Sequence, residues 1–269
     1  MIAQRSTNWV AAPCPIPAWA TLVFPSLGEN EALERLWDEV AHACRLDEDD
    51  PAAAWRERMA DLDAVAERLT SRRLDALHFE GPGTDLTVGV LPSAHWISAM
   101  FSRADGLPHL VNLPSEELFT TPDPERAEGV MRSTRPLALG GSVIEGLRVR
   151  FEGGRAVQID ADAGVDVLRT YAARDEGASR LGEVALVDRD SRIGRLGRTF
   201  YDTLLDENAA SHLALGSAYA FTVDEAERRR ANASEIHVDF MIGGDDVAVT
   251  GVTLGGERVP VLREGRWQL

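Results

Sequence analysis

The residues best suited to chemistry include a histidine and an aspartate two positions apart, His237 and Asp239, in a short apolar segment. Side chains two positions apart on a β-strand lie on the same face, so these two would project together. An imidazole nitrogen beside a carboxylate oxygen suits Zn²⁺, Mn²⁺ or Co²⁺. A hydrogen-bonded pair within a sheet is the commoner alternative, and this pair alone does not decide between them.

A second histidine lies in an alanine-rich stretch. Residues Asn208 to Ala220 are predicted to form a helix, on which His212 and Tyr219 are two turns apart and share one face. Small neighbours would let a metal ion approach His212 closely. A histidine packed in the core is the commoner alternative.

Carboxylates occur at two further places that could contribute ligands. Glu116 and Glu117 lie between an apolar strand and a Thr-Thr-Pro turn, and Glu183 begins an apolar strand. Adjacent acids usually mark a solvated loop, and Glu183 could equally be an exposed strand end. Both alternatives stay open on the residues alone.

Several common catalytic motifs are absent from the sequence. There is no H-E-x-x-H, no G-x-S-x-G, no P-loop and no G-x-G-x-x-G. The remaining histidines have no partner at ligand spacing and are interpreted as structural: His42, His78, His95 and His109.

The elements that must position these residues change in type along the chain. Residues 1–73 predict a strand-and-loop segment from Asn8 to Phe24, a helix capped by Asn30 through Leu46, and a helix from Asp50-Pro51 to about Arg72. Residues 74–269 predict mainly short strands, ending in an antiparallel meander over 236–242, 247–254 and 258–262. The fold class expected is therefore α+β, or mixed α/β, with a mostly antiparallel sheet domain after the helical segment.

The composition of the chain argues against several classes of protein. A net charge of −16 over 269 residues argues against nucleic acid and against anionic membranes. Two cysteines without a C-x-x-C pair favour a reducing, cytoplasmic compartment. Prolines interrupt the apolar amino-terminal stretch, which argues against a signal peptide. No apolar run approaches the length of a membrane span.

Five segments together resemble one family, the thermophilic-type metallo-aminopeptidases (the aminopeptidase T, aminopeptidase S and PepS group). They follow one another in the family's order, and the resemblance covers nearly the whole chain. The segments are Pro-Gly-Thr-Asp-Leu-Thr-Val-Gly (82–89), Asn-Leu-Pro-Ser-Glu-Glu-Leu-Phe-Thr-Thr-Pro (112–122), Arg-Leu-Gly-Glu-Val-Ala-Leu-Val (180–187), Leu-Leu-Asp-Glu-Asn-Ala-Ala-Ser-His (204–212) and His-Val-Asp-Phe-Met-Ile-Gly (237–243).

The resemblance implies a site for two divalent metal ions (Zn, Co, Mn or Mg) in a homodimeric enzyme that removes N-terminal residues from short peptides. The implied ligands are Glu117, Glu183, His212, His237 and Asp239, with Tyr219 an additional metal-facing residue. Tyr219 could also donate to the tetrahedral oxyanion.

Glu116 is the candidate for the proton shuttle, with Glu183 second. Members of the family usually carry a further N-terminal domain, and residues 1–73 resemble the tail of that domain. The alternatives are an amide hydrolase with one dedicated small substrate and a non-catalytic metal-binding relative.

Overall fold

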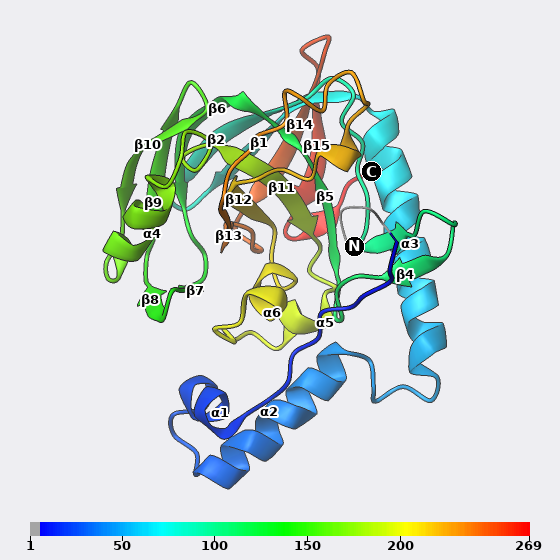
Figure 1. The fold of residues 1–269 in the computed structure, drawn as a ribbon, viewed down its shortest axis with the longest axis vertical. Coiled ribbons are helices and arrows are strands. Elements are labelled where there is room, and N and C mark those ends of the chain that lie inside the picture. Colours follow the sequence, from blue (N-terminus) through cyan, green and yellow to red (C-terminus); the bar gives the residue numbers. More distant parts are fainter. Residues whose placement is uncertain (1–5) are drawn as a thin grey trace.

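The computed structural model describes residues 6–269 and contains helices and mostly antiparallel sheets, as Figure 1 shows. It confirms the expected α+β class. The helices are α1 Pro17–Val23, α2 Glu29–Ala43, α3 Pro51–Ser71, α4 Val165–Ala172, α5 Arg192–Arg195 and α6 Thr203–Glu207, with a 3-10 turn η1 Ala220–Thr222. The strands are β1 Leu74–Gly81, β2 Thr84–Val90, β3 Met100–Ser102, β4 Pro108–Leu110, β5 Glu117–Thr120, β6 Pro122–Arg132, β7 Leu137–Leu139, β8 Ser142–Ile144, β9 Arg148–Glu152, β10 Arg155–Asp160, β11 Leu181–Val187, β12 His212–Gly216, β13 His237–Met241, β14 Ala248–Thr253, β15 Arg258–Arg263 and β16 Arg266–Trp267.

The long helix α3 begins as the sequence predicts. The Asp50 carboxylate accepts a hydrogen bond from the Ala53 backbone N–H at 2.9 Å, and Pro51 occupies the first turn. Its apolar side chains recur at helical spacing and are buried: Trp55, Met59, Leu62, Val65, Ala66 and Leu69. This face packs into the main hydrophobic core beneath the sheets.

Two predictions for the amino-terminal segment are wrong in detail. Asn30 does not cap α2, because the helix already begins at Glu29 after Gly28. The strand-and-loop segment expected from Asn8 to Phe24 forms the helix α1 in its second half, and in its first half Ala11 forms an isolated parallel bridge to Asn112. Pro17 explains the helix, since its fixed φ suits a first helical turn.

Two sheets enclose the main core. The larger has the strand order β10-β9-β6-β2-β1-β14-β15-β16, and the smaller has the order β13-β12-β11-β5. The predicted carboxyl-terminal meander is therefore wrong at its first step, because β13 belongs to the smaller sheet and β14 to the larger. Only β14 and β15 pair with each other.

A second, smaller core lies under α1 and α2. Leu36 and Val40 of α2 pack there with Ile193, Phe200 and Leu205. Both cores combine residues from either side of residue 73, where the sequence predicts a boundary between residues 1–73 and 74–269. That division stays a prediction.

None of the helices within residues 6–269 has the length and apolar character that crossing a membrane would require.

Candidate metal centre

Each strand of the smaller sheet presents at least one donor side chain on the same face. Glu117 lies on β5, Glu183 on β11, His212 on β12, and His237 with Asp239 on β13. Because side chains alternate along a strand, the intervening residues point the other way. Those residues fill the main core: Leu118, Val184, Leu186, Leu213, Leu215, Val238 and Phe240. The apolar core on one face thus fixes the register that brings the five donors together on the other.

Strand pairing explains how close the donors are. Ala185 pairs with His212 on one side and with Phe119 on the other, while Val187 pairs with Glu117. Ala214 pairs with Asp239 across β12 and β13. Ala185 and Ala214 are fully buried among the donors, and their small side chains leave the space between the larger groups.

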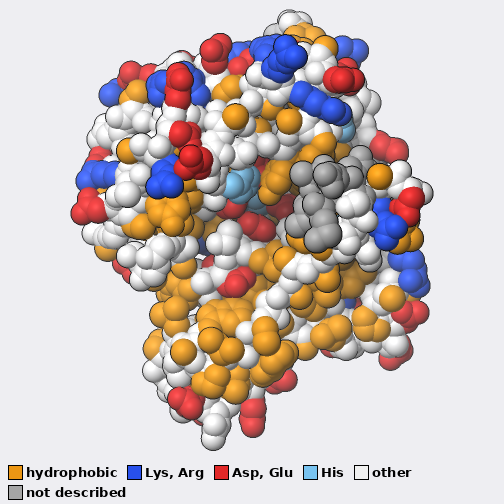
Figure 2. Space-filling view, in the orientation of Figure 1, with side chains coloured by type: hydrophobic (Ala, Val, Ile, Leu, Met, Phe, Trp, Pro, Cys, Tyr) orange, Lys and Arg blue, Asp and Glu red, His pale blue; other side chains and the backbone are white. Residues whose placement is uncertain are grey.

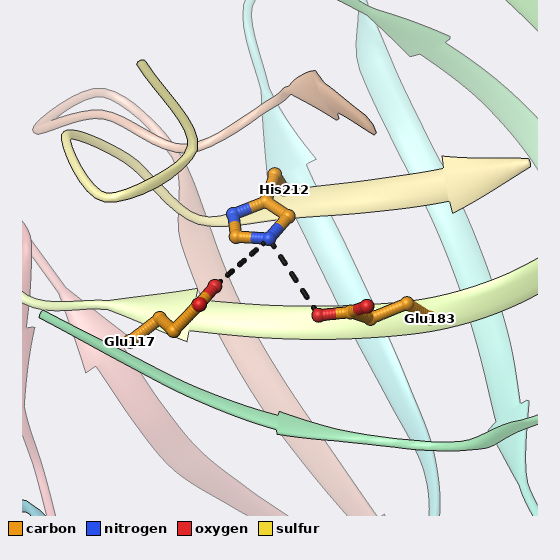
Figure 3. A group of neighbouring side chains, drawn as sticks. All are labelled: Glu117, Glu183 and His212. Atoms are coloured by element: carbon orange, nitrogen blue, oxygen red, sulfur yellow. Dashed lines mark ion pairs between the residues drawn. The ribbon is translucent and has the colours of Figure 1, made fainter. Parts of the chain in front are cut away.

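Glu183 lies at the centre of the group, and its two carboxylate oxygens face different histidines. Oε1 is 3.7 Å from His212 Nε2, and Oε2 is 3.3 Å from His237 Nε2. Glu117 Oε2 lies 3.1 Å from His212 Nε2, and Figure 3 shows Glu117 and Glu183 both directed at this nitrogen. Asp239 Oδ1 lies 3.2 Å from His237 Nε2. The donors therefore form two groups of three that share Glu183.

Backbone carbonyls orient both imidazoles. His212 Nδ1 donates to the Ala210 carbonyl at 3.2 Å, and His237 Nδ1 donates to the Ser217 carbonyl at 2.8 Å. A hydrogen bond at Nδ1 fixes the ring so that Nε2 points at the carboxylates, which is the usual arrangement of metal-binding histidines. The residue before Ser217 must be a glycine: the φ of Gly216 is +103°, and a Cβ there would lie 2.2 Å from the Ile236 carbonyl oxygen.

The cluster carries strong electrostatic perturbations. Burial raises the pKa of Glu117, against the opposing influence of His212. Burial lowers the pKa of His237, but Asp239 and Glu183 outweigh it and raise that pKa to about 11. His212 follows the same pattern, with burial opposing Glu117 and Glu183, and its pKa ends well above the ordinary value. The carboxylates thus favour positive charge on the two neighbouring imidazoles.

The donor set fits divalent metal ions. Glu117, Glu183, His212 and Asp239 are each at most 7% exposed, and Glu117 Oε2 has the ion-pair contact with His212 but no well-aligned hydrogen bond. Buried carboxylates need a counter-charge, and a metal ion is one of the usual solutions. Two carboxylate-plus-histidine groups that share a carboxylate match the nitrogen and oxygen donors of Zn²⁺, Co²⁺ or Mn²⁺.

The predicted helix around His212 is wrong. Residues 203–207 form α6, capped by Asp202, and the chain then enters β12 at His212. Pairing with strands on both sides outweighs the helix propensity of a few alanines. His212 and Tyr219 therefore share no helix face. Tyr219 still lines the cavity beside the donors, with its ring centroid 5.2 Å from that of His237.

Glu116 does not line this cavity. Its fully buried carboxylate accepts from Arg45 Nη2 at 2.8 Å and from Arg58 Nε at 2.6 Å. Arg58 also reaches Asp188 Oδ2 at 3.2 Å. The structure thus separates the adjacent acids: Glu117 joins the donors, and Glu116 anchors the start of β5 to the amino-terminal helical segment.

Sequence reasoning missed Glu207 as a site residue. Glu207 ends α6 and lines the cavity together with the five donors. Burial raises its pKa well above the ordinary value, and the charges of Glu117 and Asp239 raise it further. Its position within the segment 204–212 was the available signal, but the helix was predicted to begin only at Asn208, after Glu207.

Comparison with known proteins places these features in a family. The family described as thermophilic metalloprotease (M29) matches residues 1–267. Aminopeptidase T of Thermus aquaticus is 48% identical over 99% of this chain and 67% of its own length. Aminopeptidase AmpS of Bacillus subtilis is 41% identical, again over 99% of this chain and 67% of its own length. The chain thus spans about two-thirds of the length of these relatives.

Solved structures agree with this result. Wild-type AmpT from Thermus thermophilus superimposes with a TM-score of 0.92 at 46% identity, covering 100% of this chain and 67% of that chain. A 2,5-dihydroxypyridine dioxygenase from Pseudomonas putida shares the fold alone, with a TM-score of 0.52 at 17% identity over 78% of this chain and 63% of its own. The chain therefore belongs to the thermophilic metalloprotease (M29) family.

Proposed function

We propose that this chain is a metal-dependent aminopeptidase, a hydrolase that cleaves the N-terminal peptide bond of short peptides. The observation that carries the proposal is the position of Glu183, whose two oxygens face the two histidines. Glu183 would therefore help to hold each of two divalent ions. The relatives named above are aminopeptidases of a metalloprotease family, which supports the same reaction.

Two ions would be held by two groups of donors. Glu117, His212 and one Glu183 oxygen would hold the first; His237, Asp239 and the other Glu183 oxygen would hold the second. Zinc, cobalt, manganese and magnesium are the candidates for these donors. When bound, such ions supply an activated water and polarise the scissile carbonyl.

The remaining residues of the cavity supply binding and proton transfer. Glu207 lines the cavity without belonging to either group of three, and burial together with the neighbouring carboxylates raises its pKa, which favours a proton on this carboxyl group. We therefore assign the proton shuttle to Glu207 in place of Glu116. Glu116 is held by two arginines away from the cavity, which leaves it no path to a substrate.

Tyr219 is suited to donating a hydrogen bond. Burial raises the pKa of Tyr219, and the nearby carboxylates raise it further, so the phenol stays protonated. Its ring lies beside His237, where a donor could stabilise the oxyanion that forms at the scissile carbonyl. The excess of carboxylates would hold the α-ammonium of the substrate, which explains cleavage at the N-terminus.

We also propose that the chain forms a homodimer and works in the cytoplasm. Apolar side chains are exposed around α1 and α2, in the lower part of Figure 2, and they provide a candidate surface for pairing: Ile16, Leu22, Trp37 and Leu46. Both cysteines are free, as expected in a reducing compartment. Sedimentation at the monomer mass across micromolar concentrations would contradict the dimer, and fractionation of cells tests the location.

The experiment that tests the enzyme is hydrolysis of leucyl-p-nitroanilide by metal-stripped protein, before and after Co²⁺, Zn²⁺ or Mn²⁺ is added. We expect activity to return with metal. Glu183→Gln is the matched variant, and it should stay inactive under the same loading. A variant with full metal content and full activity would refute the assignment of Glu183.

A further inference from the structure

Four aromatic rings form a continuous wall beside the metal centre. Phe119 lies 5.4 Å from Tyr219 and 6.4 Å from Phe101, and Phe221 lies 5.1 Å from Phe101 and 5.6 Å from Tyr219, measured between ring centroids. Tyr219 in turn lies 5.2 Å from His237. The wall therefore begins at a candidate ligand and leads away from it.

These rings lie outside the two hydrophobic cores of the described residues. None of the four belongs to either hydrophobic core of the described residues, although Phe119 is only 5% exposed. Tyr219 and Phe221 are 40% and 42% exposed, so part of their apolar ring surface stays open to solvent in spite of the contacts between the rings. Aromatic side chains that pack on one another beside a cavity are typical of a binding surface.

Strand geometry places Phe119 of the wall on the same face as the candidate metal ligands. Glu117 and Phe119 are two positions apart on β5, so both project from the ligand-bearing face, while Leu118 between them enters the core. Phe101 comes from β3, and Trp9 lines the same cavity. Ala99 lies there too, where a larger side chain would reduce the space.

The cavity has two chemically different ends. Carboxylates and imidazoles occupy one end, aromatic and aliphatic side chains occupy the other, and neither lysine nor arginine lines it among the described residues. Figure 2 shows histidine and acidic side chains in a hollow with apolar side chains next to them. The cavity volume is about 100 Å³, which is room for a single side chain.

We propose that the aromatic wall is the pocket for the side chain of the substrate's N-terminal residue, and that it selects large apolar residues such as leucine and phenylalanine. This inference rests on the proposed aminopeptidase function. With the α-ammonium at the carboxylates, the side chain on the same carbon reaches the rings. Acidic N-terminal residues are disfavoured, because a carboxylate placed against the aromatic rings would lose its hydration without gaining a partner.

The test compares Phe101→Ala with wild type on leucyl-, phenylalanyl-, alanyl- and glutamyl-p-nitroanilide after metal loading. Phe101 is chosen because its ring packs on Phe119 and Phe221, whereas Tyr219 is the ring that packs on His237. We expect the phenylalanyl-to-alanyl ratio of kcat/KM to fall by about 10-fold or more in the variant. Leu254→Ala removes an exposed apolar side chain near the turn after β14 and should leave the ratio unchanged.

Other outcomes separate the pocket from the reaction. A shift in preference for the second residue of Ala-Xaa dipeptides, with no shift for the first, would overturn the assignment and place the leaving group on the wall. Preference for lysyl or glutamyl substrates would overturn it as well. If wild type cleaves none of the substrates, calorimetry with L-phenylalaninamide and L-alaninamide tests the pocket without the reaction. Tighter binding of L-phenylalaninamide that is lost in Phe101→Ala supports the pocket. Equal binding of the two amides to wild type refutes the pocket.

Discussion

Replacing Arg58 by methionine removes the guanidinium that joins two buried carboxylates. Arg58 is 14% exposed and contacts Glu116 Oε2 at 2.6 Å and Asp188 Oδ2 at 3.2 Å. Removing one partner of a buried ion pair typically costs about 3–5 kcal/mol, because a charge is left without compensation. Arg45 still contacts Glu116, and Trp267 still donates to Asp188 at 2.8 Å. We therefore expect a loss near the lower end, about 3 kcal/mol.

The same change should weaken one part of the metal centre. Glu116 and Asp188 flank the paired residues Glu117 and Val187, so Arg58 holds the ends of β5 and β11 together. Groups that orient a metal ligand are typically worth about 10–100-fold in metal affinity. We expect a loss of that size at the ion held by Glu117, and a smaller one at the ion held by His237 and Asp239.

Urea unfolding of the metal-free protein measures the first effect, and titration against a competing chelator measures the second. Arg126→Met is the matched control, because Arg126 pairs with Asp75 on the surface, where its side chain is 43% exposed. Such pairs contribute about 0–1 kcal/mol. The reasoning is refuted if Arg58→Met destabilises no more than Arg126→Met. Lost stability with unchanged metal affinity would refute the positioning role alone.

Three further predictions concern the cavity. Glu207→Gln should keep its metal but lose about 10²–10⁴-fold in kcat in steady-state kinetics. Glu116→Gln should chiefly lose stability in urea unfolding. If Glu116→Gln lost kcat and Glu207→Gln lost only stability, the proton shuttle would be Glu116. Tyr219→Phe keeps the ring and should lower kcat by about 10²-fold with little change in KM, and steady-state kinetics showing no loss would exclude the hydroxyl as a donor. Metal binding at pH 7 should release protons from His212 and His237, because burial lowers the pKa of both imidazoles but the neighbouring carboxylates outweigh it and raise both in the metal-free chain; calorimetry in buffers of different ionisation enthalpy that detects no release would contradict this.

The raised pKa of His237 also fixes the sign of a stability change. Its folded-state value of about 11 lies above the ordinary 6.5, so protonation favours the folded metal-free chain. That contribution is complete below about pH 6.5 and is lost as the pH rises through about 11. Metal-free protein should therefore lose stability toward alkaline pH.

The parts of the site that follow from strand periodicity could be predicted from the sequence. His237 and Asp239 share a face of β13 because they are two positions apart. Periodicity could not place His212, since a short run of alanine and leucine suits a helix as well as a buried strand, and neighbouring strands decided the outcome. The roles of Glu116 and Glu117 depended on which one faced Arg45 and Arg58, residues about 60–70 positions away along the chain, and no local pattern contains that information.

The aromatic wall could not be predicted from the sequence for the same reason. Phe101, Phe119 and Tyr219 come from separate elements, and only the folded sheet brings their rings together. The helix α3 was predictable because its cap, its proline and its apolar face all lie within one continuous segment. Local signals thus defined the scaffold, and the long-range pairing of β5, β11, β12 and β13 defined the centre.

The most direct test of the central claim is the number of metal equivalents bound by four proteins under identical loading. If Glu183 bridges two ions, wild type should bind about two, Glu117→Gln and Asp239→Asn about one each, and Glu183→Gln fewer than one. Retention of two equivalents by folded Glu183→Gln would contradict the bridged centre, as would a single equivalent in wild type.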